Sequence, residues 1–158
     1  MTPPGDQWLT EALATRDLDR IQPNMAAAGE RVNDARRHIR SARVIAADDP
    51  TLAIAACHDA IRKAITAHMA AAGLRPRSGE GTHRLVLEYA RQRLADVITA
   101  DDLTDADDIR RDRALAEYGD FAGRQIDADH VRTAADTAER IVNAVATNLA
   151  NNPKRPPK

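Results

Sequence analysis

Apolar positions along most of this chain recur every three or four residues, which is the spacing of one face of an α-helix. The pattern predicts a short first helix over about residues 8–18, followed by helices over about residues 24–47 and 50–72. It predicts three more, over about residues 82–97, 104–119 and 129–149. Valine and isoleucine stand mostly as single residues inside these helical patterns and do not form alternating runs. The sequence therefore predicts an all-α fold.

Residues suited to helix ends fall between the apolar stripes. Asp49 is expected to cap the third helix, with Pro50 in its first turn. Gly73 is expected to end the same helix in the left-handed conformation. The remaining predicted N-terminal caps are Thr82 for the fourth helix, Thr104 for the fifth, and Asp127 or Asp129 for the sixth.

The chain divides into three parts, and its 158 residues are enough for one domain with a sizeable core. Residues 1–22 form an N-terminal segment that contains the short first helix, and residues 23–150 form the helical bundle. The tail, residues 151–158, is rich in proline and basic residues and is expected to be disordered. Residues 74–81 are expected to form a flexible loop that carries Arg75 and Arg77.

The balance of charge limits the classes of function. The formal net charge is −1 and the pI is near 6.5, so the whole-chain charge gives no support to tight nonspecific binding of nucleic acid. The charges are unevenly spread, with arginines at positions 36, 37, 40 and 43 and an acidic block over residues 101–108. The simplest interpretation is that these are solvated helix faces that pair with each other.

The cysteine content, the apolar runs and the histidine positions limit the possible cellular compartment and cofactors. The single cysteine, Cys57, excludes an intramolecular disulfide and stands among small apolar residues, as a buried hydrophobe would. No apolar run approaches the ~20 residues that span a bilayer, so we expect a cytoplasmic protein without membrane contact. The five histidines are scattered and no glycine-rich phosphate loop is present, so no metal and no cofactor is expected. Nothing in the sequence supplies the convergent polar groups of a small-molecule pocket.

Chemistry is suggested most strongly by residues 109–120, where Arg110, Arg111 and Arg113 stand within two helical turns of Glu117 and Tyr118. On a helix Arg113 and Glu117 form an i, i+4 pair, and Arg111 lies on the same side as Tyr118. Cationic groups beside a tyrosine are what a phosphate-handling cleft needs. The alternative is a surface network in which the arginines pair with Glu117 and the acidic block, and the tyrosine is half-buried.

Three segments together resemble the HEPN superfamily: residues 53–65, residues 73–83, and residues 111–120. The resemblance covers about residues 34–149. It implies an antiparallel bundle of four to five main helices, here preceded by the short N-terminal helix. It also implies a homodimer in which the fifth helices of two protomers face each other across a cleft.

The resemblance also implies a chemistry. Many HEPN proteins are metal-independent endoribonucleases in toxin–antitoxin, phage-defence or RNA-processing systems, and some are toxins paired with a nucleotidyltransferase antitoxin. Their motif is an arginine followed, after four to six residues, by a histidine. The arginine would hold the scissile phosphate, and the histidine would serve proton transfer or positioning. Because the RNA 2′-hydroxyl is the nucleophile, the enzyme supplies only charge stabilisation and acid/base help.

This chain departs from that motif. Counted from Arg111, Asp112 fills the polar slot after the arginine, Ala116 fills the histidine slot, and Tyr118 matches the tyrosine of the Arg-x4-His-x-Tyr form. Counted from Arg113, Tyr118 itself fills the histidine slot. Neither register contains a histidine, and a tyrosine with its ordinary pKa near 10 is a poor acid/base group at pH 7.

The resemblance therefore implies a catalytic set made of Arg111, Arg113 and Tyr118, supported by Asp112 and Glu117. The RNA contacts that we expect come from Arg110, Arg75 and Arg77. A histidine could complete the site only if folding brings in one from elsewhere, such as His83 or His130.

Two functions are compatible with these observations. The first is a HEPN-type RNA-directed protein, either a ribonuclease with an altered motif or a degenerate RNA-binding relative. The alternative is a non-catalytic helical dimer that acts as a partner subunit, an antitoxin or a scaffold.

Overall fold

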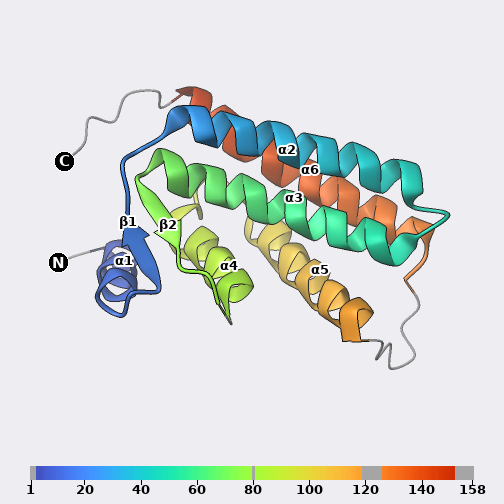
Figure 1. Cartoon of the computed structure of the whole chain (residues 1–158), viewed down its shortest axis with the longest axis horizontal. Coiled ribbons are helices and arrows are strands. Elements are labelled where there is room, and N and C mark those ends of the chain that lie inside the picture. Colours follow the sequence, from blue (N-terminus) through green and yellow to red (C-terminus); the bar gives the residue numbers. More distant parts are fainter. Residues whose placement is uncertain (1–2, 80, 119–125, 152–158) are drawn as a thin grey trace.

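The computed structural model describes residues 3–79, 81–118 and 126–151, without the side chain of Tyr118 (Figure 1). The described residues form helices and one small sheet, so the predicted all-α class is confirmed. The predicted disordered tail lies outside the described residues except for Asn151, which ends the last helix. The helices are α1 (Pro4–Ala14), α2 (Met25–Ile45), α3 (Pro50–Ala71), α4 (Thr82–Arg93), α5 (Ala100–Tyr118) and α6 (Ala128–Asn151).

Helix α3 is the centre of the bundle. It contacts α2 and α6 on one side and α4 and α5 on the other (Figure 1). Alanines at Ala28, Ala35 and Ala42 of α2 are fully buried, as are Ala53 and Ala60 of α3. A methyl side chain lets two helix axes approach closely, and the larger apolar side chains of α3 and α6 fill the remaining volume.

Three of the predicted helix ends are confirmed. The backbone amide of Leu52 donates to Oδ1 of Asp49 at 3.1 Å, which makes Asp49 the cap of α3. Gly73 follows α3 with a φ of 76°, as a left-handed terminator should. The two alternatives for α6 are resolved in favour of Asp127, whose Oδ1 accepts a hydrogen bond from the backbone amide of His130 at 2.9 Å.

Two predicted caps are wrong. Gly81, with a φ of 83°, occupies the cap position of α4, and the hydroxyl of Thr82 donates to the carbonyl oxygens of Arg77 and Gly79 at 2.9 and 2.8 Å. Helix α5 begins at Ala100, because the hydroxyl of Thr99 accepts from the third residue of that helix. Thr104 lies inside α5, and the acidic block belongs to the helix itself.

The predicted end of the first helix and part of the predicted loop are also wrong. Helix α1 ends at Ala14, and β1 (Leu18–Arg20) then pairs antiparallel with β2 (Leu74–Pro76). The reversal between α1 and β1 includes Arg16, whose φ is 62°. Strands of three residues are too short to show an alternating pattern, so nothing in the apolar spacing indicates them.

The N-terminal segment docks onto α4. The ring of Trp8 meets Tyr89 edge to face, with centroids 6.2 Å apart, and Asp6 forms an ion pair with Arg93. A Cβ on Gly5 would lie 2.4 Å from the carbonyl oxygen of Gln92, so only glycine permits this close approach of backbones. No helix within the described ranges has the length and hydropathy to cross a bilayer.

Candidate functional site

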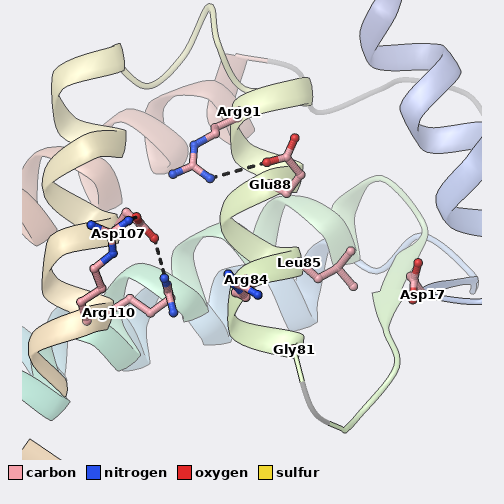
Figure 2. A pocket seen from close by; sticks show the side chains of 9 residues that line it. Asp17, Gly81, Arg84, Leu85, Glu88, Arg91, Asp107 and Arg110 are labelled. Atoms are coloured by element: carbon pink, nitrogen blue, oxygen red, sulfur yellow. Dashed lines mark hydrogen bonds and ion pairs between the residues drawn. The ribbon is translucent and has the colours of Figure 1, made fainter. Parts of the chain in front are cut away.

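Helices α4 and α5 border a hollow of about 480 Å³, here called the α4–α5 hollow (Figure 2). Arg84 and Arg91 line it from α4, and Arg110 and Arg111 line it from α5. The carboxylates that share the lining are those of Asp17, Glu88 and Asp107. Four cations against three anions leave the lining with one net positive charge in a chain whose total is −1.

Asp107 organises the arginines of α5. Its Oδ1 accepts from Nε of Arg110 at 2.9 Å, and its Oδ2 lies 2.9 Å from a guanidinium nitrogen of Arg111. Burial opposes the charged form of Asp107, but the hydrogen bond from Arg110 and the positive charges of Arg110, Arg111 and Arg91 together lower its pKa. Asp107 is therefore ionised and holds both α5 arginines at the hollow.

The arginines of α4 are held less firmly. Arg91 lies 3.5 Å from Glu88 one turn earlier, an exposed pair of the kind that contributes little stability. Arg84 is exposed and makes no hydrogen bond or ion pair with any described residue. Its guanidinium is the group in the hollow that is most available to an incoming anion.

A pair of histidines connects α3 to the start of α4. Nε2 of His58 lies 2.9 Å from Nδ1 of His83, and the two ring centroids are 4.9 Å apart. Burial, then the charges of His83 and Arg113, lower the pKa of His58 to about 3. Burial, then Arg113 and Arg62, also lower the pKa of His83. Both rings are therefore neutral at pH 7.

The charge of Arg113 lowers the pKa of both histidines, whereas Arg111 is exposed to solvent. The side chain of Arg113 is 30% exposed, and that of Arg111 is 62% exposed. The predicted i, i+4 pair is confirmed, since Arg113 lies 3.4 Å from Glu117. Folding thus brings a histidine, His83, near enough to Arg113 for the arginine charge to lower its pKa, and sequence spacing alone could not establish this because the two residues are on different helices.

A second histidine lies beside the motif segment. Nε2 of His130, in the first turn of α6, is 2.6 Å from Oδ2 of Asp112, whose side chain is 4% exposed. The contact joins residues 18 positions apart, across a segment outside the described residues, so no motif spacing could reveal it. Asp112 therefore faces α6, on a different side of α5 from the histidine pair.

The other predicted site residues are more dispersed. Ala116, in the histidine slot counted from Arg111, is half-buried on α5, and the side chain of Tyr118 lies outside the described residues. Arg75 lies on β2, where it pairs with Asp19 at 3.4 Å. Arg77 borders a smaller hollow of about 290 Å³ next to the start of α4. Neither Arg75 nor Arg77 lines the α4–α5 hollow.

The cysteine and the residue types that bind metals are the remaining candidates for reactive side chains. Cys57 is buried, and that burial raises the pKa of its thiol to about 12, so it is protonated at neutral pH. Within the described part of the chain, histidine, cysteine and carboxylate side chains form no cluster of three that could bind a metal ion.

The family model described as HEPN domain matches residues 28–149. The match takes in α3 to α5 entirely and therefore contains the α4–α5 hollow, except for Asp17, and both histidine contacts. No curated protein and no solved structure matches the chain.

Proposed function

The chain belongs to the HEPN family, and from this premise we propose that it is an RNA-directed protein whose α4–α5 hollow binds the phosphodiester backbone. If the protein is catalytic, its activity is that of a metal-independent endoribonuclease. If it is a degenerate relative, it binds RNA without cleaving it. The proposal places the protein in a toxin–antitoxin or defence system. A homodimer, with a nucleotidyltransferase as antitoxin, is the proposed assembly.

The observation that carries this proposal is the convergence of Arg84, Arg91, Arg110 and Arg111 on one hollow. A guanidinium presents its donors in a planar fork that matches two oxygens of a phosphate. Four such groups at one place give the local positive charge that the whole-chain charge lacks. Both α5 arginines are already oriented by Asp107, so little side-chain entropy is lost when a phosphate binds.

The proposal is tested by RNA affinity. Fluorescence anisotropy with a labelled single-stranded RNA of mixed sequence compares the wild type with the double variant Arg84→Gln/Arg110→Gln. The matched control is Arg36→Gln/Arg40→Gln, which removes two exposed arginines from α2, outside the lining of the hollow. We expect the hollow variant to bind at least tenfold more weakly and the control to bind nearly as well as the wild type. Equal losses in the two variants would contradict the proposal.

A second candidate is the non-catalytic helical dimer that acts as a partner subunit, antitoxin or scaffold. It is favoured by Ala116 in the histidine slot, and by Asp107 and Glu88, which already neutralise three of the hollow's arginines. It predicts a dimer in analytical ultracentrifugation together with RNA affinity that barely responds to salt. A steep salt dependence would instead favour the RNA-directed protein, because bound phosphates release counterions.

A further inference from the structure

We propose that His83, oriented by His58, is the proton acceptor of an RNA-cleaving centre that it forms with Arg113. The inference rests on the proposed function, because it assigns a catalytic group to the same RNA-directed site. In the proposed centre the histidine lies in the first turn of α4, whereas the arginine lies on α5.

The contact between the two imidazoles determines which nitrogen of His83 is available. His58 is 3% exposed and lies within α3, so its ring is fixed by the core around it. Its Nε2 meets Nδ1 of His83 at 2.9 Å. When Nδ1 of His83 donates this hydrogen bond, the lone pair of His83 lies on Nε2. That nitrogen makes no hydrogen bond to a described residue, and His83 is partly exposed.

The surroundings keep His83 in the neutral form that a proton acceptor needs. The titratable and charged groups that face it are His58, Asp59 and Arg62 from α3, and Arg110 and Arg113 from α5. Burial and the three arginines lower the pKa of His83, and Asp59 opposes them only in part. The same arginine charges that would attract a phosphate therefore keep the imidazole unprotonated before RNA arrives.

Arg110 connects this centre to the α4–α5 hollow. It lines the hollow, and it is also among the charges that lower the pKa of His83. Arg113 lies one turn further along α5, close enough to influence both imidazoles. His83 does not itself line the hollow, so the proposed centre places the scissile phosphodiester between Arg110 and the open nitrogen of His83, with Arg113 available for the charge of the transition state.

The proposed step needs no metal and balances as follows. The 2′-hydroxyl of RNA transfers its proton to Nε2 of His83, and the 2′-oxygen forms a bond to phosphorus. The bond between phosphorus and the 5′-oxygen breaks, and that oxygen takes the electron pair and a proton from water. The imidazolium returns its proton to the hydroxide that remains. The products are a 2′,3′-cyclic phosphate and a 5′-hydroxyl.

His130 does not offer the same chemistry in this arrangement. Its Nε2 is engaged by the buried carboxylate of Asp112, and it lies on α6, outside the lining of the hollow. Because removal of this contact is expected to destabilise the fold, His130 does not serve as a control. The control for the removal of a histidine is His38 on α2, away from both α5 and the hollow.

The test compares His83→Gln with His38→Gln, and measures binding and cleavage of the same labelled RNA in metal-free buffer. DNA of the same sequence reports whether the 2′-hydroxyl is required. We expect the wild type to cleave RNA only and to leave cyclic phosphate ends. His83→Gln should cleave at least 100-fold more slowly with affinity within twofold of the wild type, since general acid/base catalysis typically contributes that factor. The His38→Gln control should retain cleavage.

Two further readouts separate a catalytic role from a structural one. Exogenous imidazole should restore cleavage to folded His83→Ala, and the wild-type rate should fall at acid pH as His83 becomes protonated. Cleavage by His83→Gln at the wild-type rate would overturn the role of His83 and leave the proposed function intact. A wild type that binds RNA without cleaving it would also overturn that role and leave RNA binding. A wild type that neither binds nor cleaves would overturn both.

Discussion

Nε2 of His130 lies 2.6 Å from Oδ2 of the buried Asp112, and this contact ties the start of α6 to the inner side of α5. We expect His130→Ala to lower the free energy of unfolding by about 1–3 kcal/mol, because a buried carboxylate loses a hydrogen-bond partner. Urea denaturation measures the effect. Arg132→Ala, which removes an exposed partner of Asp129, is the matched control and should change stability by less than about 1 kcal/mol. Equal losses of stability in the two variants would mean that the contact between His130 and Asp112 does not stabilise the fold.

Asp107 competes with any anion for Arg110 and Arg111, so removal of its charge should strengthen anion binding. Asp107→Asn should strengthen RNA binding by about three- to tenfold, equal to roughly 0.6–1.4 kcal/mol, because two guanidinium groups lose a charged partner. Anisotropy titration measures the change. The control is Asp136→Asn, which removes one of the two carboxylate partners of Arg43 where α2 meets α6, outside the lining of the hollow. If both variants gain equally, the effect reports only net charge.

The buried His58 makes stability depend on pH. Its pKa falls from an ordinary 6.5 to about 3 in the folded protein, so the unfolded chain binds a proton that the folded chain does not. The contribution of His58 to stability is complete above about pH 6.5 and is lost as the pH falls toward 3, at up to about 1.4 kcal/mol per pH unit. Urea denaturation of the wild type and His58→Gln at pH 7 and pH 5 should show a steeper loss in the wild type. Parallel losses would contradict this account.

Gly73 is required by its backbone and by its surroundings. Its φ is 76°, and a Cβ there would lie 2.8 Å from the carbonyl oxygen of Ile21. Gly73→Ala should therefore destabilise the fold by roughly 1–3 kcal/mol. Gly29→Ala is the matched control, because Gly29 is an exposed position within α2 where an added methyl group would have no neighbour within 4 Å. It should stabilise the fold by about 0.5–1 kcal/mol in thermal or urea unfolding. Destabilisation by both changes would show that local strain is not the cause.

The helices are predictable from the sequence because their apolar spacing is regular and their caps are local. Asp49, Gly73 and Asp127 act within one turn of the positions that they terminate, so their role is visible in a short window of sequence. The cap of α5 is ambiguous in the sequence, because Thr99 and Thr104 are equally suitable residues beside the same acidic block. The pairing of β1 with β2 joins residues more than 50 positions apart and has no local signal.

For the same reason, the sequence predicts only some of the residues of the candidate site. Arg110, Arg111 and Arg113 are indicated by their position on one helix together with Glu117. Their partners from other helices depend on tertiary structure, which the sequence does not display. The histidine pair joins His58 to His83 across 25 positions, and no local pattern singles out the arginine that α4 contributes at position 84.

The central claim is that the α4–α5 hollow binds RNA phosphates, and the salt dependence of RNA affinity tests it most directly. For single-stranded RNA, the slope of log affinity against log salt is about −0.7 for each phosphate that the protein neutralises. We predict a steep slope for the wild type, and for Arg84→Gln/Arg110→Gln a slope that is shallower by about 1.4. The control Arg36→Gln/Arg40→Gln should keep the wild-type slope. A shallow wild-type slope, or identical slopes in all three proteins, would contradict the account.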